Sequence, residues 1–126
     1  MMTKRILMID DEEDILIVTR RCLELEAGWE VMVASSSAEG LDLAQRSQPD
    51  AILLDVMMPD MDGAATIKRL KANSTTASIP VVFLTAKHSP AERDWCLGLG
   101  AVAVVGKPFD PLDISHQISR ALGWED

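Results

Sequence analysis

Five short, mostly apolar runs alternate along the chain with segments whose apolar residues recur at helical spacing. The runs cover residues 6–9, 30–34, 51–54, 81–84 and 101–105. Apolar runs of this length are typical of strands buried on both faces, and the intervening segments are long enough to form crossover helices. The alternation therefore predicts an α/β fold with one five-stranded parallel sheet and helices on both of its faces. Right-handed crossovers would bring the carboxyl ends of all strands to one edge.

The expected helices carry apolar positions that would face this sheet. In the first helix, Ile15, Val18, Cys22 and Leu25 have helical spacing, and Gly28 ends the helix. The inward positions of the later helices are Leu41 and Ala44, Ile67 and Leu70, and Ile114, Ile118 and Leu122.

The limits of the helices follow from capping and helix-breaking residues. Ser35–Ser37 supplies an N-cap for the second helix, which stops before Pro49. Pro90 can open the fourth helix, which is expected to run to about Gly100, and Gly123 ends the fifth.

The overall charge restricts the kinds of partner. The 126 residues suffice for one domain with a single core, and they carry a net charge of −8. This acidity argues against binding to nucleic acid or to an anionic membrane, since both require clustered Lys and Arg. No apolar stretch approaches the ~20 residues of a membrane span, and no apolar secretory segment precedes Asp10, so we expect a cytoplasmic protein. Cys22 and Cys96 lack metal-site spacing and are expected to be buried thiols.

Polar side chains stand where four of the five expected strands end. Asp10 and Asp11 follow the first strand, Asp55 the third, Thr85 the fourth and Lys107 the fifth. In a doubly wound sheet these side chains would converge at one edge, where ligands bind. Three carboxylates a few ångströms apart raise one another's pKa unless a cation compensates them. A divalent cation with oxygen ligands, Mg²⁺ above all, would compensate them together with the Lys107 ammonium.

Each of these residues also has an ordinary structural explanation. The acidic run 10–13 could cap a helix and complement its dipole, and Asp55 could open a turn. Thr85 could be a strand residue or a cap. Lys107 could be a solvated loop lysine followed by a turn at Pro108, for which a cis bond is one option. The coincidence of all five residues at strand ends favours a site.

Four segments, taken in order, resemble the receiver domain of the bacterial two-component response regulators. They are Asp10–Asp11 after an apolar strand, residues 53–63 (LLDVMMPDMDG), residues 79–86 (IPVVFLTA) and residues 106–109 (GKPF). Pro59 and Gly63 are expected to force an ordered loop in the second segment. The resemblance covers essentially the whole chain, so we expect one receiver domain over residues 1–126. It implies a flavodoxin-like, doubly wound five-stranded parallel sheet in the order 2-1-3-4-5 with five helices, an order known for this family.

The resemblance also assigns roles to the residues at the strand ends. Asp55 would be the nucleophile that takes a phosphoryl group from a phosphohistidine on a histidine kinase or a histidine phosphotransfer protein. Asp11 and Asp55 would bind Mg²⁺ directly, with the Met57 backbone carbonyl as a third protein ligand, and Asp10 would act through a metal-bound water. Phosphoryl transfer depends mostly on positioning and on charge stabilisation, which a metal and a lysine provide.

The remaining roles concern the phosphoryl oxygens. Lys107 would pair with one of them, and the Thr85 hydroxyl with another, helped by the Ala86 backbone N–H. Met57 and Lys87 would flank the path of water to the phosphoryl group. The domain would not be an enzyme for a separate substrate, but a phospho-acceptor that assists its own phosphorylation and dephosphorylation.

Two positions depart from the family pattern. An aromatic residue commonly lies three positions before the lysine, but Val104 stands there and the chain has no tyrosine. A relay from Thr85 to a moving ring is therefore in doubt. Trp95 stands where the fourth helix usually presents a polar residue, so it is either an apolar anchor on a partner-binding face or ordinary packing. The face formed by the fourth helix, the fifth strand and the fifth helix is the expected contact surface for a downstream protein.

We therefore expect a stand-alone response regulator that acts through protein contacts. One alternative is a receiver-like interaction module that works without phosphorylation, which Val104 motivates, and another is a fragment of a larger regulator. A phosphatase with an aspartyl nucleophile fits less well, because such enzymes place an acid two residues after the nucleophile, where Met57 stands. No glycine-rich phosphate loop supports nucleotide binding.

Overall fold

In the computed structural model the chain is described over residues 3–58, 62–86, 89–107, 109–110 and 113–124. Five strands form one sheet in the order β2-β1-β3-β4-β5, and every neighbouring pair is parallel. The elements in chain order are β1 (Arg5–Ile9), α1 (Glu13–Ala27), β2 (Glu30–Ala34), α2 (Ser37–Ser47), β3 (Ala51–Asp55), α3 (Gly63–Ala72), β4 (Val81–Thr85), α4 (Pro90–Gly98), β5 (Ala103–Gly106) and α5 (Ile114–Leu122). The predicted fold class and strand order are confirmed.

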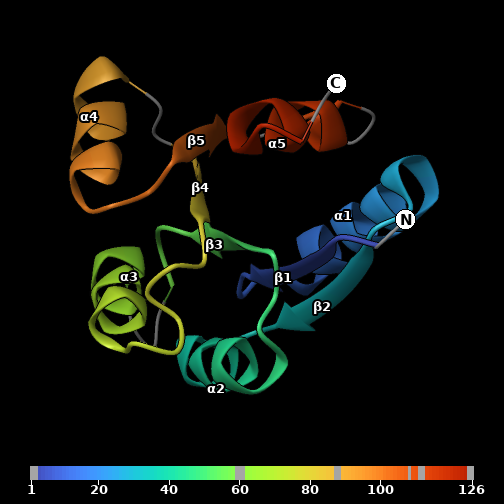
Figure 1. Cartoon of the computed structure of the whole chain (residues 1–126). Coiled ribbons are helices and arrows are strands. Elements are labelled where there is room, and N and C mark those ends of the chain that lie inside the picture. The colour runs from blue at the N-terminus through green and yellow to red at the C-terminus, as the bar shows by residue number, and fades with distance from the viewer. Residues whose placement is uncertain (1–2, 59–61, 87–88, 108, 111–112, 125–126) are drawn as a thin grey trace.

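The sheet lies between two layers of helices. Figure 1 shows α2, α3 and α4 on one face and α1 and α5 on the other. The first layer encloses a core that includes Leu54 and Phe83, and the second encloses one that includes Leu53 and Leu84. Successive residues of β3 and β4 thus point to opposite faces, and both faces are buried, which explains why these strands carry no alternating polar residues.

The strand predictions are correct to within two residues. The largest difference is at the fifth strand, predicted from residue 101 and observed at Ala103–Gly106. The Val102 N–H still donates to the Val81 carbonyl over 2.9 Å, so pairing with β4 begins just before the regular strand. The shift matters for the site because the regular pairing then continues to Thr85↔Gly106, directly before Lys107.

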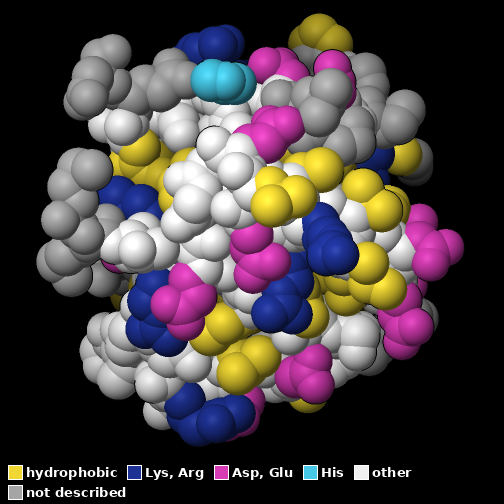
Figure 2. Space-filling view, turned by 90° about the vertical axis from the view of Figure 1, so that its right-hand side faces the viewer, with side chains coloured by type: hydrophobic (Ala, Val, Ile, Leu, Met, Phe, Trp, Pro, Cys, Tyr) yellow, Lys and Arg dark blue, Asp and Glu magenta, His cyan; other side chains and the backbone are white. Residues whose placement is uncertain are grey.

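The face of α1 that packs on the sheet differs from the predicted one. Leu16, Thr19 and Leu23 are buried, whereas Val18 is exposed and Leu25 is 82% exposed. The prediction was wrong because the helix contains two apolar stripes, and spacing alone does not decide which of them meets the sheet. Figure 2 shows the side of the molecule that carries α1, where hydrophobic side chains lie scattered between charged ones.

Of the other helices, α2, α3 and α4 begin at side-chain caps. The hydroxyls of Ser36 and Ser89 accept from the N–H groups of Glu39 and Glu92, so two of the helices have serine caps. Gly28, with φ +70°, ends α1 in the left-handed conformation that a glycine adopts without strain. The inward positions predicted for α2, α3 and α5 are buried or half-buried.

The loop after Asp55 is shaped in part by Gly63, whose N–H donates to the Val56 carbonyl over 2.7 Å. A Cβ atom at Gly63 would lie 2.8 Å from both Val56 Cα and Phe83 Cε1, so this position requires glycine. The expected turns at Pro59 and Pro108, and the expectation for Lys87, lie outside the described residues.

Three residues close the structure at the amino ends of the strands. The rings of Trp29 and Trp124 meet edge to face with centroids 5.3 Å apart, and Lys4 Nζ lies 4.7 Å from the centroid of Trp124. This contact anchors the end of α5 beside β1 and β2. No helix among the described residues is long and apolar enough to cross a membrane.

Candidate functional site

The site begins with the two acids that follow β1. Asp10 is fully buried, and its N–H donates to the Ala34 carbonyl over 3.1 Å, so the pairing of β1 with β2 continues through it. Asp11 is exposed. The Asp10 carboxylate is held by the N–H of Glu12, which donates to Oδ1 over 2.9 Å. One acid is therefore fixed in the protein interior, and the next faces solvent.

Asp55 is the last residue of β3 and is 5% exposed. The pairing with β4 places it opposite Leu84, and the Val56 N–H donates to the Leu84 carbonyl over 3.1 Å. The Met57 N–H lies 3.3 Å from Asp55 Oδ1 and donates to it. The carboxylate is thus held at the edge of the sheet by the backbone that follows it.

Lys107 reaches the same place from the end of β5. Its N–H donates to the Thr85 carbonyl over 2.7 Å, which sets Lys107 beside Thr85 at the end of β4. The Lys107 side chain is 11% exposed, and its Nζ lies 2.7 Å from Asp10 Oδ2 and 3.5 Å from Asp55 Oδ2. Thr85 itself is buried, and Ala86 is exposed at the start of the following turn.

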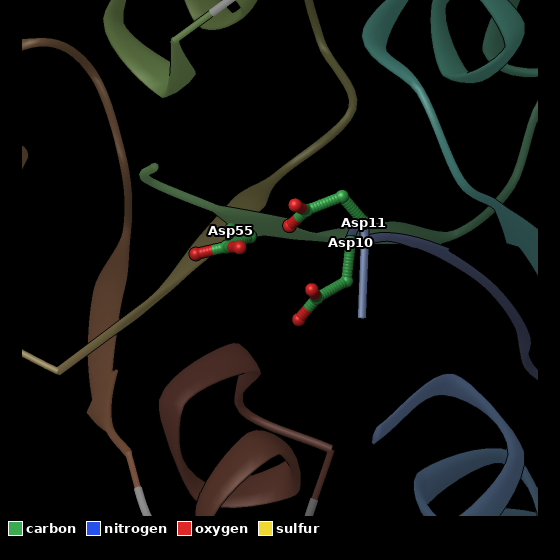
Figure 3. Close-up of side chains that lie close together, drawn as sticks. All are labelled: Asp10, Asp11 and Asp55. Atoms are coloured by element: carbon green, nitrogen blue, oxygen red, sulfur yellow. The ribbon is translucent and has the colours of Figure 1, made fainter. Parts of the chain in front are cut away.

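The three acids form one cluster, as predicted from the strand ends. Oxygens of Asp10, Asp11 and Asp55 lie within 4.8 Å of one another. Figure 3 shows the carboxylates approaching one another from the ends of two neighbouring strands. Among the described residues, this is the group of acids, histidines and cysteines that could hold a metal ion.

The charges of the cluster are not balanced by the protein alone. Burial raises the pKa of Asp55 from 3.8 to about 6, and the neighbouring Asp10 carboxylate adds to the rise, whereas Lys107 and the Met57 N–H oppose it. Burial also opposes the charge of Lys107, but the hydrogen bond and charge of Asp10, with Asp55 and Glu12, raise the pKa of this ammonium above its usual value. One lysine is therefore shared by several carboxylates.

The donor set fits Mg²⁺. Carboxylate oxygens are hard ligands, and a magnesium ion in a protein is typically held by one or two carboxylates together with waters. Here Asp55 supplies a buried oxygen and Asp11 an exposed one, so a partly hydrated ion has access from solvent. The pKa of Asp55 is raised by burial first and by the neighbouring Asp10 carboxylate second, and a bound dication would favour the ionised form against both.

One contact of the site was missed by the sequence reasoning. Glu12 Oε1 lies 3.3 Å from Lys107 Nζ, so a fourth acid belongs to the surroundings of the lysine. The sequence pattern indicates Glu12 only as a helix-capping candidate, and the acidic run directly after a strand is the signal that could have placed it at the site. A hollow of about 750 Å³ lies between α2 and α3 and is lined by none of these side chains.

The residues that depart from the family pattern lie away from the carboxylates. Trp95 is 45% exposed on α4, and Val104 in β5 is half-buried against the core beneath α4. The structure therefore excludes complete burial of Trp95. Both cysteines are free; Cys96 is buried as expected, whereas Cys22 is only half-buried.

A doubly wound 2-1-3-4-5 sheet with three acids and a lysine at its carboxyl edge defines the class of flavodoxin-like domains with an acidic pocket. Comparison with known proteins narrows this class. The family profile of the "Response regulator receiver domain" matches residues 6–119. The chain belongs to the response regulator receiver domain family, and it is the receiver domain of a two-component response regulator.

Relatives with known names agree with this assignment. The chain is 36% identical over 121 residues to the alkaline phosphatase synthesis transcriptional regulatory protein PhoP of Bacillus subtilis, a match that covers 96% of this chain and 49% of that protein. It is 40% identical over 108 residues to the response regulator MprA of Mycobacterium sp. strain KMS. This match covers 86% of this chain and 46% of that protein. The chain spans about half the length of these curated relatives.

Solved structures show the same fold over nearly the whole chain. The chemotaxis response regulator CheY4 of Vibrio cholerae matches with a TM-score of 0.88 at 30% identity, covering 95% of this chain and 99% of that one. A CheY-like receiver domain protein of Methanospirillum hungatei matches with a TM-score of 0.86 at 30% identity, covering 98% and 96%.

Proposed function

We propose that this receiver domain accepts a phosphoryl group on Asp55 from a phosphohistidine of a histidine kinase or a histidine phosphotransfer protein. The observation that carries the proposal is the position of Asp55, a buried carboxylate 3.5 Å from the ammonium of Lys107 and clustered with Asp10 and Asp11. Family membership supports the choice of donor.

The reaction follows from the chemistry of a carboxylate. An Asp55 oxygen attacks phosphorus, the P–N bond of the phosphohistidine breaks, and the imidazole leaves with the electron pair. The product is an acyl phosphate, a reactive mixed anhydride that suits a transient signal. Burial raises the pKa of Asp55 to about 6, so the carboxylate remains mostly ionised, and therefore nucleophilic, at neutral pH.

Mg²⁺ is the proposed cofactor. Asp11 and Asp55 would hold it directly with the Met57 carbonyl, and Asp10 would reach it through a water; the Met57 and water-mediated roles come from the family resemblance. When bound, the ion supplies positive charge that offsets the phosphoryl oxygens. The residues of the chain position the nucleophile: the Met57 N–H donates to Asp55 Oδ1, and Lys107 offsets its charge.

Lys107, Thr85 and Ala86 would bind the phosphoryl group once it is attached. Lys107 is already an ion-pair partner of Asp55, so a phosphoryl oxygen on Asp55 comes within reach of its Nζ. The backbone bond from the Lys107 N–H to Thr85 keeps the lysine beside the threonine. In this proposal the domain assists its own phosphorylation and dephosphorylation and is not an enzyme for a separate substrate.

The proposed output is a change in protein contacts on the surface of α4, β5 and α5. Trp95, 45% exposed on α4, supports an apolar anchor on this surface. We further propose that the protein is a cytoplasmic, stand-alone regulator and that it binds neither membrane nor nucleic acid. The net charge of −8 supports the second part of this proposal. The competing proposal is that these residues belong to a longer regulator, as the names and lengths of PhoP and MprA suggest.

Val104 favours a second candidate function, an interaction module that works without phosphorylation. Valine offers no ring that could move between exposed and buried positions, and Val104 is already half-buried against the core. In this case the surface of α4 and β5 would bind its partner equally well in the phosphorylated and the unphosphorylated protein. Partner affinity that does not change on phosphorylation would support this candidate.

The test of the main proposal is incubation with a small acyl phosphate, or with a histidine kinase, in the presence of Mg²⁺. We expect an acid- and hydroxylamine-sensitive phosphate on the wild-type protein and none on Asp55→Asn, which keeps the size of the side chain. Asp62→Asn, an acid of the same loop outside the cluster, is the matched control and should be phosphorylated. Labelling of Asp55→Asn at the wild-type level would refute the role of Asp55.

A further inference from the structure

Glu12 stands at the N-cap position of α1, yet its side chain makes no hydrogen bond to the helix. An N-cap side chain normally accepts from the first N–H groups of its helix, and short residues such as Ser or Asp do this best. Instead, the Glu12 carboxylate accepts from the ammonium of Lys107 over 3.3 Å. The residue that could cap α1 is therefore turned toward the site.

The partners of Lys107 are unequal. Its Nζ donates to Asp10 Oδ2 over 2.7 Å and to Glu12 Oε1 over 3.3 Å, whereas Asp55 Oδ2, at 3.5 Å, is an ion-pair partner only. Both hydrogen-bond acceptors found for Nζ in the described part of the chain thus belong to the segment between β1 and α1. The backbone of this segment also ties Glu12 to Asp10, through the bond from the Glu12 N–H to Asp10 Oδ1.

We propose that Glu12 is a positioning residue that, together with Asp10, holds the Lys107 ammonium on the β1–α1 side of the site, so that Lys107 forms only an ion pair with Asp55, at 3.5 Å. Asp10 is fully buried and fixed. The Glu12 side chain is 57% exposed, so water can replace the ammonium when Lys107 leaves. Of the two hydrogen-bond acceptors of Lys107, Glu12 is therefore the one that is given up more easily.

The consequence for the site rests on the proposed function. A phosphoryl group on Asp55 would attract Lys107 more strongly than the Asp55 carboxylate does, because it carries more negative charge. Lys107 must then turn an ammonium hydrogen from Glu12 to a phosphoryl oxygen, and the bond to Glu12 opposes that exchange of partners. Glu12 thus restrains the lysine before phosphorylation and lowers the rate at which a phosphoryl group is captured.

Two variants separate this role from helix capping. Glu12→Gln removes the charge and keeps the size, whereas Glu12→Ser provides a good N-cap but cannot reach Lys107. Glu13→Gln makes the same charge change one residue further on, at an exposed position with no contact to Lys107 among the described interactions, and is the matched control. If Glu12 served α1 alone, Glu12→Ser would behave as wild type.

The direct measurement is the exchange of the Lys107 ammonium hydrogens with water, followed by NMR on ¹⁵N-labelled lysine without Mg²⁺. Exchange is expected to be about two- to fivefold faster in Glu12→Gln and Glu12→Ser, the range given by loss of a partly exposed ion pair. Glu13→Gln should match wild type. Unchanged exchange in both Glu12 variants, or the same acceleration in Glu13→Gln, would overturn the proposal.

The second measurement is the rate of phosphate uptake from a small acyl phosphate with saturating Mg²⁺. We expect an increase of about 1.5- to fivefold in both Glu12 variants and none in Glu13→Gln. An unchanged or lower rate would mean that Glu12 does not restrain Lys107, and would overturn the proposal. If the wild-type protein takes up no phosphate, the proposed function fails, while the exchange measurement still decides the role of Glu12.

Discussion

The two ends of the sheet are held together by opposite kinds of contact. At the carboxyl ends of the strands, Asp10, Asp55 and Lys107 are nearly buried charges that touch one another. At the amino ends, Trp29 and Trp124 meet edge to face beneath Lys4. The helix α5 runs between these ends, since it follows Lys107 and is followed by Trp124.

The difference between the ends separates function from stability. Buried like charges cost free energy that only a cation recovers, so the carboxyl end is expected to be the less stable one until a metal binds. The aromatic end buries apolar surface and contains one exposed cation, which needs no compensation. Changes at the carboxyl end should therefore alter activity and stability together, and changes at the aromatic end should alter stability alone.

The largest effect is expected from Lys107→Met, which removes the positive charge and keeps most of the stem. Asp10 and Asp55 lose their shared partner, so the free energy of unfolding without Mg²⁺ should fall by about 3 kcal/mol. Phosphate uptake should fall about 100-fold. Urea denaturation and labelling measure the two effects, with the exposed Lys68→Met as control. Stability that Mg²⁺ fails to restore would contradict the charge explanation.

The next effect is the pH dependence caused by Asp55. Its folded pKa of about 6 exceeds the ordinary value of 3.8, so the folded protein binds more protons between these values and loses stability as the pH rises through them. Asp55→Asn removes this loss. Without Mg²⁺ and above pH 6, its free energy of unfolding should exceed that of the wild-type protein by about 1–3 kcal/mol. The difference should vanish near pH 4.

Urea denaturation over this pH range tests the prediction, with the exposed Asp94→Asn as the control that should show no such difference. Mg²⁺ should reduce the advantage of Asp55→Asn, because the ion stabilises the ionised wild-type carboxylate. An advantage that is the same at pH 4 and pH 8 would rule out the titration of Asp55 as its cause.

At the aromatic end, Trp124→Ala should reduce the free energy of unfolding by about 1–2 kcal/mol, because the ring loses its partner Trp29. Phosphate uptake per folded molecule should stay unchanged, since Trp124 lies at the opposite edge from Asp55. The matched control is the exposed Trp95→Ala, expected to change stability by less than about 0.5 kcal/mol. Slower uptake in Trp124→Ala would show that the two ends are coupled through α5.

The smallest effect is expected from Lys4→Met. The ammonium lies over the Trp124 ring at an exposed position, where a cation–π contact is worth about 0.5 kcal/mol. The double variant with Trp124→Ala should show no further loss from Lys4→Met. A loss at Lys4 that persists without Trp124 would mean that the lysine acts through some other contact.

The fold and the acid cluster were predictable because both follow from local patterns. Five apolar runs specify five strands, and a parallel sheet collects the residues at their carboxyl ends whatever the helices do. Asp10, Asp55, Thr85 and Lys107 each directly follow or end a strand in the structure, and Asp11 comes next after Asp10. Their convergence thus needed only the strand ends and the strand order, and the order came from the family resemblance.

The packing face of α1 and the contact between Trp29 and Trp124 were not predictable in this way. Leu16 and Val18 belong to two stripes of similar hydrophobicity on one helix, and only the position of the sheet decides between them. Trp29 and Trp124 are separated by most of the chain, so no spacing relates them.

The sequence by itself determined where the strands lie to within two residues, and hence which charged groups reach the carboxyl edge of the sheet. Only the tertiary structure decided how those groups share their partners: that Lys107 hydrogen-bonds to Asp10 and Glu12 and forms only an ion pair with Asp55. The physical reason is that strand formation depends on local apolar patterns, whereas the sharing of a cation depends on differences of a few tenths of an ångström in the distances between residues far apart in the chain.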